Sequence, residues 1–162
     1  MRAPVVVVNL CGAPATGKST LASHLRDVLR PEADVFYISY DRIERGRYER
    51  SEQKPLWERE TWRWARIHAI HILSDLLQIL RSDGEGKIAE DILSYPARNR
   101  ESKLNVVIVD DTMHLRSMRH SIMKLCQIYQ CSYVPIYTFC SRESMLNRNA
   151  ERSIEYYCVL RV

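Results

Sequence analysis

The sequence predicts an α/β fold in which helices cover both faces of a mostly parallel sheet. Strand patterns alternate with helix patterns along the chain, and the strands are continuous apolar runs, as in sheets buried on both faces. A glycine-rich segment, GAPATGKST, joins the first strand to the first helix. With 162 residues, 46% of them hydrophobic, the chain is the size of one domain, so we expect residues 1–162 to share a single core.

The first half of the chain contains two predicted strands and two predicted helices. The first strand is the β-branched run Val5–Leu10, which we place at the centre of the sheet. A helix over 17–29 follows, with leucine and valine at helical spacing until Pro31. The second strand spans 35–39. A long amphipathic helix covers 56–81 and ends at the glycine-containing segment SDGEG.

The second half contains the third strand at 105–109, a helix at 115–129 and the fourth strand at 133–139. Pro135 cannot donate a ladder hydrogen bond, so we expect the fourth strand to lie at an edge or to be bulged. The segment 87–104 is predicted to be a partly helical connection. Numbering these four strands along the chain, we expect the order 2-3-1-4.

Composition limits the possible partners but identifies none. The net charge of +4 is too small to indicate a polyanion. The five cysteines are an odd number without C-x2-C spacing, which favours a reduced cytoplasmic protein. No apolar run approaches the roughly 18 residues of a membrane span, so we expect a soluble protein. Nothing in the sequence indicates a membrane or DNA partner.

The segment GAPATGKST matches G-x-x-x-x-G-K-[ST], the phosphate-binding P-loop, between the strand and helix that this motif requires. Glycines let successive N–H groups face one concavity, and the helix dipole adds positive potential. Lys18 would reach the β- and γ-phosphates, and the Ser19 hydroxyl would bind Mg²⁺. We therefore predict a three-layer P-loop NTPase or kinase fold that takes ATP and Mg²⁺. A glycine-rich turn without a ligand is the alternative. The predicted nucleotide-binding residues are Gly12, Ala13, Pro14, Ala15, Thr16, Gly17, Lys18, Ser19 and Thr20.

Carboxylates follow two of the predicted strands. Asp110 ends the third strand, where P-loop folds hold a second acid that orders Mg²⁺, here through water. A helix N-cap or loop carboxylate is the alternative, and it applies more strongly to Asp111. Asp41 follows the second strand at the same sheet edge. It could accept a proton from an acceptor hydroxyl or orient that hydroxyl, unless it is a solvated loop acid.

Two groups of arginines fit either a functional or a structural role. Arg148 and Arg152 have the spacing R-x-x-x-R, so a helix would place both on one face. They could form a lid that neutralises phosphate charge, or a solvated basic face. Arg59, Arg63 and Arg66 recur among three tryptophans. This stripe could contact RNA, but tryptophan packing with arginines paired to nearby glutamates or water fits it better.

With the P-loop, Asp41 and the segments DDTMHLRSMRHSIMKLCQIY and RNAER, the sequence resembles the L-seryl-tRNA(Sec) kinase family. The likeness runs through most of the chain. Its most specific part is the Asp110-Asp111 pair followed by Ser-Met-Arg and then the R-x-x-x-R pair. The resemblance implies transfer of the ATP γ-phosphate, an alcohol-group phosphotransfer, to the serine of Ser-tRNA(Sec). The product is O-phosphoseryl-tRNA(Sec), a precursor of selenocysteine. It also implies that Asp41 acts at the acceptor hydroxyl and that Arg148 and Arg152 serve activity from a lid.

Family members continue after the arginine pair into further helices of the kinase core and a module that grips tRNA, whereas this chain ends with SIEYYCVLRV. We therefore expect a short form without the last strand and without the C-terminal tRNA-binding module. Two alternative functions share the P-loop. One is a kinase for a small metabolite. The other is a nucleotide-binding accessory protein of tRNA wobble modification, like the P-loop partner of Elongator.

Overall fold

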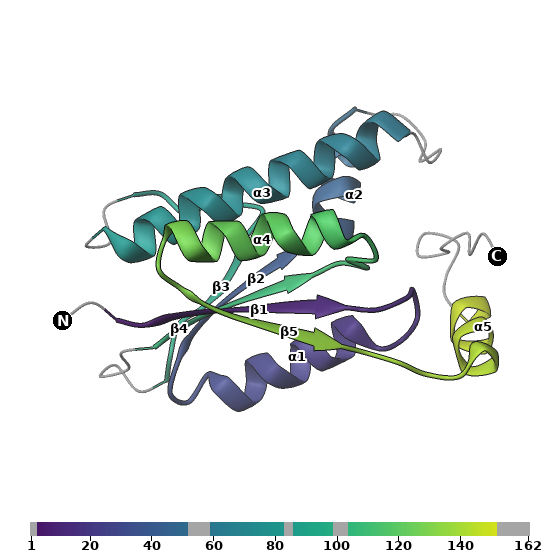
Figure 1. Ribbon diagram of the computed structural model, residues 1–162. Helices are drawn as coiled ribbons and strands as arrows, with labels where there is room; N and C mark the ends of the chain where they lie inside the picture. Colours follow the sequence, from purple (N-terminus) through teal and green to yellow (C-terminus); the bar gives the residue numbers. More distant parts are fainter. Residues whose placement is uncertain (1–2, 52–58, 83–85, 99–103, 152–162) are drawn as a thin grey trace.

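The apolar runs form a five-stranded sheet in the computed structural model, which describes residues 3–51, 59–82, 86–98 and 104–151 (Figure 1). The order is β3-β2-β4-β1-β5, and every pairing is parallel except that of β3 with β2. The four predicted strands therefore have the predicted order 2-3-1-4. The strands are β1 (Val5–Cys11), β2 (Asp34–Ser39), β3 (Leu93–Tyr95), β4 (Asn105–Asp110) and β5 (Ser132–Tyr137).

Helices cover both faces of this sheet. Figure 1 shows α1 (Lys18–Leu29) on one face and α3 (Arg59–Arg81) with α4 (Arg116–Ile128) on the other. Two helices that we did not predict, α2 (Tyr40–Ser51) and α5 (Arg142–Ala150), lie toward the carboxyl ends of the strands. The predicted three-layer α/β architecture is confirmed. Residues 56–58 of the predicted long helix lie outside the described part.

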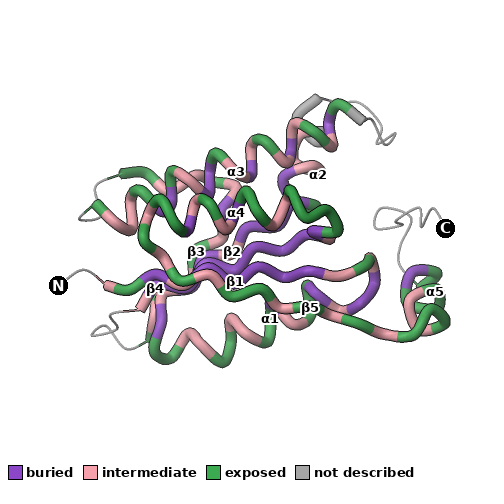
Figure 2. The backbone as a smooth tube through the Cα atoms, in the orientation of Figure 1, coloured by how far each residue is buried: buried purple, intermediate pink, exposed green. Residues whose placement is uncertain are grey.

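The core consists of two apolar clusters, one on each side of the sheet. Alternate residues of β1 and β4 point to opposite faces, so that Val7 packs with the α3 and α4 side and Leu10 with the α1 side. Both faces of β4 are buried along its whole length, as Figure 2 shows for the central strands. None of the described helices is long and apolar enough to cross a membrane.

The prediction of a partly helical connection over 87–104 is wrong for the described residues, because none of 87–98 is helical and Leu93–Tyr95 form β3. Val35 lies opposite Tyr95 and Tyr37 opposite Leu93. Pro96 disfavours a helical conformation at the residue before it. The edge of β2 also offers unpaired N–H and C=O groups to which an extended segment can bind. The turn is anchored by the Ala97 N–H, which donates to Asp34 Oδ1 at 2.7 Å.

The prediction for Pro135 is confirmed, because β5 lies at the end of the strand order. In the described part of the chain β5 pairs with β1 alone, with Pro135 in register with Asn9. Its residues are exposed or half-buried, in contrast to those of β1. An edge strand tolerates a residue that has no N–H to donate.

Candidate functional site

The P-loop spans the gap between β1 and α1, and two of its glycines have conformations or contacts that exclude larger residues. A Cβ on Gly12 would lie 2.7 Å from the carbonyl oxygen of Thr138 and 2.3 Å from its Oγ1. Gly17 precedes α1 with φ +93°, in the left-handed region. The Gly12 N–H donates to the carbonyl of Thr112 at 3.0 Å. The loop is therefore fixed against both strands that flank β1.

Lys18 lies over the loop as its motif predicts. Its ammonium donates to the carbonyl oxygens of Gly12 at 3.0 Å and Ala13 at 2.8 Å, and the residue is 9% exposed. The Thr16 hydroxyl donates to the same Ala13 carbonyl at 2.8 Å and lies 2.6 Å from the Thr138 hydroxyl. A positive charge thus lies over the folded loop, an arrangement suited to receive phosphate oxygens.

Tyr37 contacts Asp110, one of the two residues predicted to order Mg²⁺. Its hydroxyl donates to Asp110 Oδ2 at 2.7 Å. Burial raises the pKa of Tyr37, the negative charge of Asp110 raises it further, and hydrogen bonding with Ser39 and Ser19 lowers it. Asp110 is therefore hydrogen-bonded to Tyr37, and Ser19 is near enough to this hydroxyl to influence its pKa. A hydroxyl and a carboxylate are oxygen donors of the kind that the hard Mg²⁺ prefers, so Ser19 and Asp110 fit that ion. Sequence analysis did not identify Tyr37, which occupies an ordinary aromatic position in β2.

Asp111 forms a buried ion pair with Arg66 of α3. Both carboxylate oxygens accept from Arg66 Nη2, at 3.0 and 3.1 Å, and the side chains are 2% and 14% exposed. Burial raises the pKa of Asp111, and the Arg66 charge opposes that rise. The guanidinium also stacks over the Trp62 ring, 3.8 Å from its centroid. The Arg66 side chain therefore lies on the side of α3 that faces the core, whereas Arg63 is exposed. The side chain of Arg59 lies outside the described part.

Asp41 occupies the first turn of α2, directly after β2, and is exposed. The Arg42 N–H donates to the Ser39 hydroxyl at 3.3 Å, which caps this helix. The charge of Asp41 contributes to the raised pKa values of Glu44 and Asp111, after the larger effect of burial on each. Asp41 thus lies at the predicted sheet edge, open to an incoming hydroxyl and close to the Asp111 carboxylate.

Arg148 reaches the P-loop from the far side of a cleft. The cleft has a volume of about 720 Å³ and is lined by Gly17 and Thr20 of the loop, and by Arg148 and Glu151 at the end of α5. Its partner in the R-x-x-x-R pair, Arg152, lies outside the described residues. The structure therefore places Arg148 in the same cleft as the P-loop, and its action as a lid arginine stays a prediction.

Arg119, part of the Ser-Met-Arg segment, holds the loop after β4. Its Nη1 donates to the carbonyl oxygens of Met113 and His114, the latter at 3.0 Å. Met113 has a positive φ of 46° and is buried, a conformation that needs support from its surroundings. Thr112 of this loop accepts from Gly12, so Arg119 and the P-loop contact the same loop. The sequence pattern indicated the segment but not this contact.

No group of three or more His, Cys, Asp or Glu side chains in the described ranges is placed to hold a metal ion. His68 instead pairs with Asp91 at 3.0 Å and stacks on Trp64. The Mg²⁺ position expected here differs from such a cluster, because P-loop proteins hold that ion mainly through phosphates, water and few side chains.

Comparisons with known proteins agree with this geometry. Residues 4–157 match the family described as chromatin associated protein KTI12. The chain is 25% identical over 180 aligned residues to the L-seryl-tRNA(Sec) kinase of Mus musculus, with 89% of this chain and 48% of that protein covered. The chain thus spans about half the length of this curated relative.

Solved structures share the fold. A putative kinase from Chloroflexus aurantiacus aligns with a TM-score of 0.64 at 18% identity, covering 94% of this chain and 68% of that one. The Mycobacterium tuberculosis APS kinase CysC, solved with AMPPNP and APS, aligns with a TM-score of 0.58 at 13% identity, covering 93% of this chain and 71% of that one. The fold is that of P-loop kinases.

Proposed function

The chain belongs to the KTI12 family of P-loop proteins, and from this premise we propose that it transfers the γ-phosphate of ATP to the serine hydroxyl of Ser-tRNA(Sec). One observation carries the proposal. Lys18 lies over the P-loop, and Asp110 at the end of β4 accepts from the Tyr37 hydroxyl. The named activity of the mouse relative supports the choice of acceptor.

Each residue of the site would have its own role in the reaction. Lys18 moves from the loop carbonyls to the β- and γ-phosphates, which the P-loop N–H groups also hold. Ser19 and, through water, Asp110 would hold Mg²⁺, which would neutralise part of the phosphate charge. Arg148 closes the cleft and balances the charge of the transferring group.

Asp41 would work on the acceptor. It accepts the proton of the serine hydroxyl while the serine oxygen bonds to the γ-phosphorus. The bond from that phosphorus to the oxygen it shares with the β-phosphate breaks, and ADP departs with the electron pair. Its exposure in the first turn of α2 leaves room for the ester-linked serine at this position.

A γ-phosphate transfer assay tests the proposal with four acceptor conditions: Ser-tRNA(Sec), Ser-tRNA(Ser), free serine and none. We expect labelled phosphoserine on Ser-tRNA(Sec). Lys18→Ala should abolish it, and Asp41→Asn should slow it by about 10² while ATP binding persists. Phosphorylation of free serine at a similar rate would instead identify a small-metabolite kinase. Transfer to none of the acceptors would reject the kinase proposal.

The family match favours a second candidate, because it covers nearly the whole chain and carries a name that is not that of a kinase. In this alternative, the same P-loop hydrolyses ATP to regulate the binding of tRNA or a protein partner. The transfer assay separates the two functions. An accessory ATPase would release inorganic phosphate faster when tRNA is added, without forming phosphoserine.

A further inference from the structure

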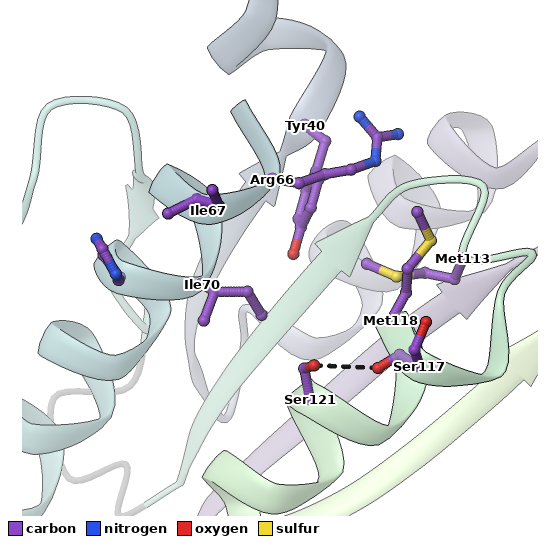
Figure 3. A pocket seen from close by; sticks show the side chains of 9 residues that line it. Tyr40, Arg66, Ile67, Ile70, Met113, Ser117, Met118 and Ser121 are labelled. Carbon is purple, nitrogen blue, oxygen red and sulfur yellow. Dashed lines mark hydrogen bonds between the residues drawn. The ribbon is translucent and has the colours of Figure 1, made fainter. Parts of the chain in front are cut away.

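A cavity of about 340 Å³ lies between α3 and α4 and is not part of the P-loop cleft (Figure 3). Its walls are mainly apolar and include Tyr40, Ile70, Met113 and Met118. Figure 3 shows the Tyr40 hydroxyl directed into the space between Ile70 and Met118. Besides the Tyr40 hydroxyl, polar atoms come from Arg66 and His71 of α3 and from two serines of α4. The cavity thus offers an apolar slot with a few hydrogen-bonding groups.

The cavity is next to the candidate reaction centre. Arg66 lines it and also pairs with Asp111 at 3.0 Å. Asp111 lies between Asp110, the last residue of β4, and Thr112, whose carbonyl oxygen accepts from the Gly12 N–H of the P-loop at 3.0 Å. Tyr40 lines the cavity and immediately precedes Asp41 in the chain.

We propose that this cavity binds the terminal nucleoside of an aminoacylated RNA and leaves the ester-linked serine free to reach Asp41. The inference rests on the proposed function and names the part of the acceptor that the chain recognises. A base would lie among Ile70, Met113 and Met118, and the Tyr40 hydroxyl, which is directed into the cavity, would be available to its polar edge.

The size and chemistry of the cavity fit a nucleoside better than a serine. Small-ligand pockets begin at about 300 Å³, so this volume suits one flat ring system with its sugar. A serine side chain is only a hydroxymethyl group, and it would leave apolar walls of methionine and isoleucine uncovered. Bases gain binding energy by stacking against aromatic and apolar surfaces whatever their sequence. The cavity would therefore make the chain select serine carried on a nucleoside over free serine.

The test is calorimetric binding of 3′-deoxy-3′-(L-serylamido)adenosine, a stable amide analogue of the charged RNA end. The protein is first saturated with AMPPNP and Mg²⁺, which keeps the probe out of the ATP site. Serinamide is the comparison ligand, since it carries the same amino acid without the nucleoside. We expect the analogue to bind at least tenfold more tightly than serinamide. Equal affinities, or no binding of the analogue, would overturn the proposal.

A cavity-filling variant tests the location. Ser121 lines the cavity, is exposed on α4, and donates to the Ser117 carbonyl at 3.0 Å (Figure 3). Ser121→Trp should weaken binding of the analogue at least tenfold and leave AMPPNP binding intact. Ile128→Trp is the matched control, at an exposed position of the same helix outside the cavity. If Ser121→Trp binds the analogue like the control, the assignment is wrong.

The outcomes for the cavity and for the proposed function are separable. Normal phosphoryl transfer to Ser-tRNA(Sec) with an unchanged KM in Ser121→Trp would reject the cavity and keep the kinase. Tight binding of the analogue that Ser121→Trp abolishes, with no phosphoryl transfer to any acceptor, would keep the cavity and reject the kinase.

Discussion

The Arg66–Asp111 ion pair gives the sharpest test of the site's packing. The closest N···O distance is 3.0 Å, and the side chains are 14% and 2% exposed. With an effective dielectric constant of about 20, the attraction at this distance is roughly 5 kcal/mol, and desolvation of the two charges offsets much of it. Removing one partner leaves the other buried without compensation. We therefore expect Arg66→Met to lower the free energy of unfolding by about 3–5 kcal/mol near pH 7.

The penalty should depend on pH in a defined direction. Burial raises the pKa of Asp111, and Arg66 holds that rise in check, so the pKa rises further in Arg66→Met. A folded-state pKa above the unfolded value means that the folded state binds the proton more tightly. The resulting stability is present at low pH and is lost as pH rises through the folded-state pKa. Arg66→Met should therefore be less destabilising near pH 5 than near pH 7.

Urea unfolding followed by circular dichroism measures both effects. Arg26→Met is the matched control, because Arg26 also pairs with an aspartate, Asp27 at 2.8 Å, and also stacks on an aromatic ring, that of Tyr95. The side chains of Arg26 and Asp27 are 29% and 63% exposed, so we expect Arg26→Met to lower the free energy of unfolding only slightly. If Arg66→Met costs no more than this control at either pH, the ion pair is not buried as described.

Two further substitutions test the P-loop and the Mg²⁺ position. Gly12→Ala should weaken Mg²⁺·ATP binding by at least about tenfold, since the new Cβ would lie 2.7 Å from the Thr138 carbonyl oxygen and displace the loop, whose main chain binds the phosphates. Adding Thr138→Ala should restore binding only in part, because it removes the contact with Oγ1 and keeps the carbonyl; full calorimetric recovery would contradict this account. Tyr37→Phe removes the donor to the buried Asp110, so the free energy of unfolding should fall by about 1–3 kcal/mol and Mg²⁺-dependent ATP affinity should drop. Tyr137→Phe, at a ring 51% exposed on β5, is the control, and equal effects in urea unfolding and ATP titration would exclude a special role for Tyr37.

Several features of this protein follow from the sequence alone because they depend on neighbours in the chain. The apolar run of β1 and the spacing of Gly12, Gly17 and Lys18 define a strand, a turn and a helix start within a short segment. Pro135 identifies an edge strand through the N–H that it lacks. The positions of Asp41 and Asp110 follow from the rule that parallel strands end at one sheet edge. Their catalytic and metal-binding roles remain predictions.

Other features required the tertiary structure. The short strand β3 forms because the edge of β2 is available to it, and a three-residue strand has no periodicity to detect. Arg66 looked like one member of a basic stripe, but it crosses to Asp111, 45 residues away in the chain. Tyr37 reaches Asp110 only because β2 lies beside β4. A local pattern specifies how each segment turns and which face is apolar, whereas the partner of a buried charge or hydroxyl is specified by packing between distant segments.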